Sequence, residues 1–276
     1  MVLTKLRLAV LVVVSAISGY LFADGPQVLS EIVWLSLGGL LVTAGSSGLN
    51  EVLERNQDAV MKRTQNRPIP AGRMSVATGV ILSLIFGIAG LAILYFFLGY
   101  LTAALGLLSL VLYVAIYTPL KKITPLAVFV GAIPGALPPM LGYIAKSNEF
   151  GFEPGILFFV QFMWQFPHFW AIAWIAHEDY MKAGYHLLPS KEGKSRKSST
   201  IILVYTLVLI PVSLSPWVFE LAGWISFMIA SLLGGLFYLQ ALKLHRTQQD
   251  KDAKKLMFYS FLYLPIMQFT YVLDKI

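Results

Sequence analysis

Long apolar stretches constrain the fold of this chain more than any other feature. Nine occur, at about residues 6–23, 31–49, 77–98, 100–118, 124–145, 155–176, 199–218, 222–242 and 256–273. Stretches of about 18 or more apolar residues can cross the hydrocarbon core of a bilayer as helices. Hydrophobic residues make up 57% of the chain, charged residues only 13%, and the mean hydropathy is +0.72. The sequence therefore predicts an all-α integral membrane protein with nine transmembrane helices in a single domain, 1–276.

The positions of Lys and Arg predict how these helices are oriented. With a cytoplasmic N-terminus, all of the 21 basic residues except Lys146 and Lys275 fall in cytoplasmic segments, where such residues are enriched. The C-terminus is then external. No Arg- and Ser-rich transit sequence precedes the first apolar stretch, which we interpret as a retained helix, so a bacterial plasma (inner) membrane is favoured.

Charge and cysteine content exclude several classes of protein. The net charge of +7 is explained by this topology and by contact with an anionic lipid bilayer, so no nucleic acid is expected as a partner. The chain has no Cys, which excludes disulfides, thiolate metal sites and covalent haem attachment through a Cys-x-x-Cys-His motif.

Two acidic clusters follow apolar stretches on the predicted cytoplasmic side. Asn50, Glu54 and Asp58 are spaced four apart, which places their oxygens on one helix face. Glu178 and Asp179 follow the sixth stretch. Oxygen ligands of this kind suit Mg²⁺, and all five are candidate metal ligands, with Asp179 preferred over Glu178. The alternative for the first cluster is a solvated helix end with Glu54 paired to a nearby Lys or Arg.

Basic and aromatic residues near these acids are candidates for binding a diphosphate, because Arg and Lys donate to phosphate oxygens while a metal neutralises charge. The alternative is simple anchoring of the cytoplasmic side by positive charge. The candidates are Lys62, Arg63, Arg67, Tyr117, Lys121 and Lys182.

Two predicted helices carry features of a ligand cavity. Residues 131–142 hold three Gly and three Pro, which would distort a helix, so this segment is expected to face a pocket. The next helix contains His168, an ionisable residue inside a membrane segment. It is interpreted either as lining a cavity for a flat acceptor, as an iron ligand, or as a neutral His bonded to a helix carbonyl. The expected cavity, opening at the cytoplasmic face, is lined by Tyr143, Trp164, His168 and Phe169.

Several motifs resemble the UbiA superfamily of intramembrane prenyltransferases, and within it the branch that acts on haem. They are "NRPIPAGR" (66–73), "YTPLKK-TP" (117–125, omitting Ile123), "GAIPGALPPMLGY" (131–143), "WQFPHFWAIA" (164–173), and "EDYMKAG" leading to "LLP" (178–189). The chain departs from the superfamily pattern at Glu54 and Asn56, where Asp is usual, and at Ala183, where the wider superfamily has a second Asp.

The resemblance implies transfer of a farnesyl group from farnesyl diphosphate to a vinyl group of protohaem IX, with water addition, to make haem O. It implies Mg²⁺ as the cofactor, Asn50, Glu54, Asp58 and Asp179 as catalytic residues, and an association with haem A synthase or oxidase-assembly proteins. Prenylation of an aromatic or quinone precursor, and transport of an organic anion, are the alternatives.

Overall fold

A computed structural model gives the architecture. It describes residues 6–276, and the burial of side chains from Leu8 onward. This part of the chain consists of helices and the loops between them, with one isolated β-bridge between Ala222 and Lys275. The helices are α1 (Leu6–Phe22), α2 (Leu29–Val60), α3 (Val76–Leu98), α4 (Tyr100–Val111), the π-helix η1 (Leu112–Tyr117), α5 (Thr118–Leu120), α6 (Ala127–Ser147), α7 (Phe152–Ile175), α8 (His177–Lys182), α9 (Arg196–Val218), α10 (Trp224–Thr247) and α11 (Asp250–Leu273).

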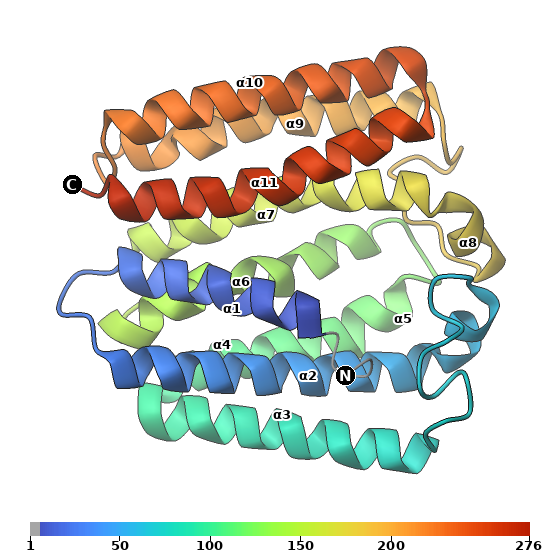
Figure 1. Ribbon diagram of the computed structural model, residues 1–276, viewed down its shortest axis with the longest axis horizontal. Coiled ribbons are helices and arrows are strands. Elements are labelled where there is room, and N and C mark those ends of the chain that lie inside the picture. The colour runs from blue at the N-terminus through green and yellow to red at the C-terminus, as the bar shows by residue number, and fades with distance from the viewer. Residues whose placement is uncertain (1–5) are drawn as a thin grey trace.

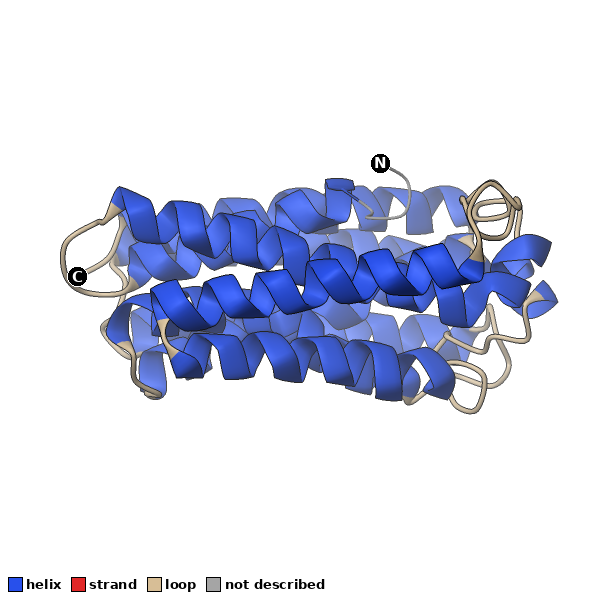
Figure 2. Ribbon diagram, turned by 90° about the horizontal axis from the view of Figure 1, so that it is seen from below, coloured by secondary structure: helices blue, strands red, loops and turns tan. Residues whose placement is uncertain are grey.

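The long helices lie side by side along one axis, and their connections gather at the two ends of the bundle (Figures 1 and 2). The loop after α2 and the short helix α8 share one end, whereas the C-terminus lies at the other. Within residues 6–276, eight spans are long and apolar enough to cross a membrane, with α4, η1 and α5 forming one of them. The 17-residue α1 is the ninth apolar helix and is shorter. This is a multi-pass membrane protein.

Helix α6 is continuous from Ala127 to Ser147, although it contains three prolines that were expected to distort it. Pro138 and Pro139 have no N–H, which deprives the carbonyls of Pro134 and Gly135 of their intrahelical donors. Ser109 Oγ donates to the Pro134 carbonyl at 3.4 Å, and Gln161 Nε2 donates to that of Gly135 at 2.7 Å. Side chains from α4 and α7 thus satisfy backbone groups that lipid could not.

Glycines bring α6 and α1 into backbone contact. A Cβ at Gly142 would overlap the carbonyl oxygen of Ala16, and one at Gly19 would overlap that of Pro139. Small residues permit this close approach, which is typical of helix pairs in membranes. The largest hydrophobic core lies between α6, α7, α9, α10 and α11, where the rings of Phe166, Trp170 and Tyr205 pack together.

Candidate active site

The first acidic cluster lies on the last turns of α2. The helix extends beyond the apolar stretch 31–49 and continues to Val60, as the spacing of Asn50, Glu54 and Asp58 predicts. Asn50, Glu54 and Asp58 are therefore helical and share one face, and all three are buried. A helix extended beyond the apolar stretch, with its polar face covered by protein, fixes three oxygen-bearing side chains in a row.

Each of the two carboxylates in this row contacts a base. Lys121, which follows α5, forms an ion pair with Oε1 of Glu54. Arg67, in the loop after α2, places Nη1 2.6 Å from Oδ2 of Asp58. The other oxygen of Asp58, Oδ1, is buried and makes no hydrogen bond in the structure. Acids and bases predicted to share a site are thus in direct contact.

The π-helix η1 connects Asn50 to the span that carries Lys121. The Thr118 hydroxyl donates to the Tyr113 carbonyl at 2.8 Å and accepts from Asn50 Nδ2 at 3.0 Å. Segments of π-helix often occur at functional sites because they displace the following residues around the helix. Here the segment ends at Tyr117, whose ring centre lies 4.7 Å from Nζ of Lys121.

The second acidic cluster lies on α8, a separate short helix after α7, and α8 contacts α2. The Arg63 backbone N–H donates to Oδ2 of Asp179 at 3.4 Å, and Nη2 of Arg63 donates to the Tyr180 hydroxyl at 3.3 Å. Lys182 lies 3.8 Å from Oδ1 of Asp179. The loop after α2 therefore joins the two clusters at one end of the bundle (Figure 1).

Four of the predicted residues lie at the edge of this arrangement and are exposed to solvent: Lys62, Arg63, Glu178 and Lys182. Asp179 is half-buried. Of the two acids on α8, Asp179 is thus the one that faces the loop after α2.

The donor set suits a magnesium ion bound together with phosphate. Within residues 6–276, no three His, Cys, Asp or Glu side chains form a group able to hold a metal by themselves. Mg²⁺ commonly takes only one or two carboxylates and completes its shell with water and substrate phosphates. Asp58, with one buried oxygen that makes no hydrogen bond, fits that requirement.

Sequence reasoning missed two buried residues at this site. Glu51 accepts a hydrogen bond from the Ile69 N–H at 3.1 Å, which fixes the "NRPIPAGR" loop against α2. Tyr185, in the loop after α8, donates to Oε1 of Glu54 at 2.9 Å. The signal for Glu51 was its place as an acid between Asn50 and Glu54. No local signal identifies Tyr185, which reaches Glu54 only through the fold.

The aromatic residues predicted to line a cavity separate into two places. Trp164, His168 and Phe169 lie together on α7, with the Trp164 and His168 rings stacked at 4.6 Å. Tyr143 lies near the opposite end of α6 from the acidic clusters. His168 is about 10 Å along α7 from the end near α8, at about 1.5 Å per residue.

The tautomer of His168 follows from its neighbours. Its Nδ1 lies 2.6 Å from Oγ of Ser260, and that hydroxyl donates its single hydrogen to the Met257 carbonyl at 2.6 Å. Nδ1 must then carry the proton and donate to Ser260, which leaves the lone pair of the ring on Nε2. The neutral His168 ring therefore has a lone pair on Nε2 that could ligate iron. Its Nδ1 donates to the Ser260 side chain and not to a helix carbonyl.

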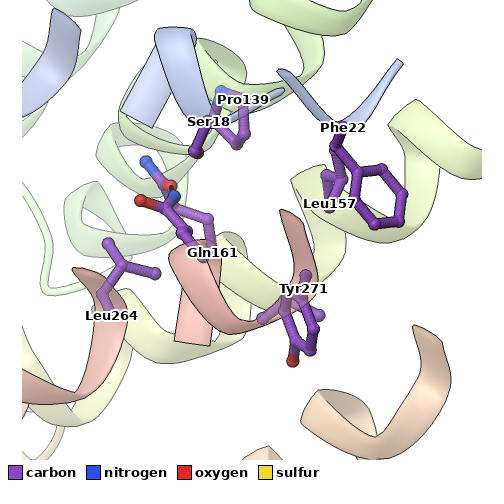
Figure 3. Close-up of a pocket in the computed structure, with 9 residues that line it drawn as sticks. Ser18, Phe22, Pro139, Leu157, Gln161, Leu264 and Tyr271 are labelled. Atoms are coloured by element: carbon purple, nitrogen blue, oxygen red, sulfur yellow. Dashed lines mark hydrogen bonds between the residues drawn. The ribbon is translucent and has the colours of Figure 1, made fainter. Parts of the chain in front are cut away.

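A small cavity of about 10 Å³ lies away from the acidic clusters, between α1, α6, α7 and α11 (Figure 3). Its polar lining includes Gln161, whose Oε1 accepts from Ser15 at 2.6 Å and from Gln268 at 2.7 Å. The volume is about that needed for one water molecule. Gln161 Nε2 also donates to the Gly135 carbonyl, so the network joins α1, α6, α7 and α11. No acidic residue lines the cavity.

The apolar helices, and the acids and bases opposed at one end of the bundle, are the features of an intramembrane prenyltransferase. A family model described as the UbiA prenyltransferase family matches residues 12–263, and the chain belongs to that family. Two bacterial relatives are named "Protoheme IX farnesyltransferase". The one from Cytophaga hutchinsonii is 48% identical, covering 99% of this chain and 96% of its own. The one from Christiangramia forsetii is 46% identical, covering 99% and 92%.

Solved structures share this fold at low sequence identity. A digeranylgeranylglyceryl phosphate synthase has a TM-score of 0.80 at 17% identity, over 99% of this chain and 95% of that one. A UbiA homologue from Archaeoglobus fulgidus bound to GPP and Mg²⁺ has a TM-score of 0.69 at 16% identity, over 98% of each chain. The predicted fold class is confirmed.

Proposed function

We propose that this prenyltransferase moves a farnesyl group from farnesyl diphosphate to a vinyl group of protohaem IX. The observation that carries the proposal is the juxtaposition of Glu54 with Lys121 and of Asp58 with Arg67 at the end of the bundle where α8 lies. The relatives named for this reaction match nearly the whole length of the chain. The orientation follows from the positions of Lys and Arg: this end is cytoplasmic, and the C-terminus is external.

The diphosphate would bind where these ion pairs now lie. Asn50, Glu54, Asp58 and Asp179 would hold Mg²⁺, which when bound supplies positive charge to stabilise the departing diphosphate. Arg67 and Lys121 can turn from the carboxylates to the phosphate oxygens, since both are anionic oxygen acceptors. The guanidinium of Arg63, which donates to the Tyr180 hydroxyl, can turn to them in the same way. The acids and bases thus exchange partners with the ligand, and buried charges remain paired throughout.

Transfer of the farnesyl group to the vinyl group needs no added oxidant or base. The allylic C–O bond breaks and its electron pair leaves on diphosphate, the vinyl group forms a C–C bond with the farnesyl C1, and water adds to the new cation and loses a proton. Aromatic faces stabilise such cations. Tyr117, whose ring lies 4.7 Å from Nζ of Lys121, is an aromatic side chain beside the predicted diphosphate position.

The acceptor is expected deeper in the bundle. Trp164, His168 and Phe169 form an aromatic cluster about 10 Å or more along α7 from its cytoplasmic end. A flat porphyrin could stack there, with Nε2 of His168 available to its iron. An association with haem A synthase or oxidase-assembly proteins would then pass on a product that is too apolar to leave the membrane.

The test is mass analysis of the products made by the purified protein from haem, farnesyl diphosphate and Mg²⁺. We expect a haem product heavier by one farnesyl group and one hydroxyl group, and no product after chelation of the metal. A product formed only from aromatic or quinone precursors would contradict the haem acceptor. Counterflow of an organic anion in proteoliposomes without any product would instead indicate a transporter.

A further inference from the structure

Tyr185 is buried beside the metal-site candidate Glu54, although it comes from a different part of the chain. It lies in the loop after α8, where Gly184 adopts a φ of +74° and turns the chain back towards the bundle. The Tyr185 N–H donates to the Tyr180 carbonyl at 2.8 Å, and Leu187 and Leu188 insert into the core. The loop is therefore held at both ends, and the position of the Tyr185 ring is well defined.

The hydroxyl of Tyr185 makes one specific contact, a hydrogen bond of 2.9 Å to Oε1 of Glu54. Lys121 pairs with the same oxygen, and its Nζ lies 5.4 Å from the centre of the Tyr185 ring. A carboxylate oxygen only accepts hydrogen bonds, so the Tyr185 hydroxyl is the donor in this contact.

These two donors behave differently when a diphosphate binds. Lys121 carries a charge and can turn to a phosphate oxygen, which releases Oε1 from one of its contacts. Tyr185 has no charge, and its ring is fixed by the loop, so its hydrogen bond to Glu54 is the contact that stays. Since Tyr185 follows α8, this bond also connects the second acidic element to the first.

We propose that Tyr185 is a positioning residue that orients the Glu54 carboxylate for the metal and diphosphate. This inference rests on the function proposed above. It names a residue that sets the affinity of the proposed active site for Mg²⁺ and diphosphate. Glu is one methylene longer than Asp and has an additional rotatable bond, so a Glu ligand needs an anchor that an Asp does not. Removal of a residue that orients a metal ligand typically costs 10-fold to 100-fold in affinity or activity.

The length of Glu54 provides a sharp test. In Glu54→Asp the carboxylate retreats by about 1.5 Å, the length of one C–C bond. An oxygen now 2.9 Å from the Tyr185 hydroxyl would then lie beyond hydrogen-bond reach. If Tyr185 acts through Glu54, its hydroxyl matters in the parent protein and is dispensable in Glu54→Asp.

The experiment is a double-mutant cycle of Tyr185→Phe and Glu54→Asp in nanodiscs. The measured quantity is the Mg²⁺ concentration that half-saturates binding of farnesyl thiodiphosphate, an unreactive analogue, with kcat determined in parallel. We expect Tyr185→Phe to raise this concentration on the order of tenfold in the parent protein, and less than about twofold in Glu54→Asp.

Tyr263→Phe is the matched control. Tyr263 is as buried as Tyr185, each being 2% exposed, and its hydroxyl donates to Ser213 at 2.7 Å between α11 and α9, away from Glu54. Tyr263→Phe should change protein stability without changing the Mg²⁺ concentration that half-saturates binding of the analogue. Equal effects of Tyr185→Phe in both backgrounds, or no effect in either, would overturn the positioning role. Failure of the parent protein to bind the analogue with Mg²⁺ at all would instead contradict the proposed function.

Discussion

Arg67 contacts only one of the two carboxylate oxygens of Asp58. Its Nη1 lies 2.6 Å from Oδ2, whereas Oδ1 is buried and makes no hydrogen bond. A buried carboxylate oxygen without a partner costs free energy, on the order of 1–3 kcal/mol. A ligand that supplies a cation at this point removes the cost, which is why we assign Asp58 a central role in binding Mg²⁺ and diphosphate.

Asp58→Asn preserves the shape of the side chain and removes its charge. We expect kcat for prenyl transfer to fall by at least about 100-fold, as for loss of a direct electrostatic contact to the transition state. The control is Asp252→Asn, which changes another fully buried Asp, at the start of α11. Near-normal turnover by Asp58→Asn in purified protein would refute the metal role.

Glu51 is expected to act through the loop that carries Arg67. Glu51→Ala leaves the buried Ile69 N–H without its acceptor, a loss of about 1–3 kcal/mol in the free energy of unfolding. Glu51→Gln keeps an acceptor oxygen and should retain most of the stability. We also expect Glu51→Ala to raise KM for the prenyl diphosphate more than it lowers kcat, as thermal unfolding and steady-state kinetics can show. If Glu51→Ala and Glu51→Gln have the same KM for the prenyl diphosphate, Glu51 does not position the loop.

The contact between α1 and α6 predicts unequal effects of two Gly→Ala substitutions. In Gly142→Ala the new methyl group collides with the Ala16 backbone, so α1 must move and the yield of folded protein should fall sharply. In Gly155→Ala the methyl group meets no atom within 4 Å and should be tolerated. Detergent size-exclusion profiles measure both. Equal yields would show that α1 is not held against α6.

His168→Ala tests the proposed acceptor site. We expect weaker haem binding, because the variant lacks the ring that stacks on Trp164. If Nε2 ligates iron, the Soret band of the bound haem should also shift and be restored by added imidazole. If His168 only lines the cavity, affinity falls without that shift. His245→Ala, at the end of α10, is the control. Unchanged binding and turnover would assign His168 a structural role.

The sequence was sufficient to predict the helices and the two acidic elements, and the asymmetry of Lys and Arg predicts their sidedness. Each of these depends on local properties: the length of apolar stretches, the asymmetry of Lys and Arg, and the spacing of Asn50, Glu54 and Asp58 along one helix face. The continuous course of α6 was not predictable, because Ser109 and Gln161 on other helices supply the donors that its prolines lack.

Only the tertiary structure decided which base meets which acid. Lys121 rather than a nearer base pairs with Glu54, and Tyr185 reaches the same carboxylate from a loop 131 residues away. A charge pattern along a chain states which residues could form pairs, whereas burial and helix packing choose among them. The amino-acid sequence by itself therefore determined the membrane-spanning helices and the kind of chemistry, and the packing of the helices determined the geometry that can perform it.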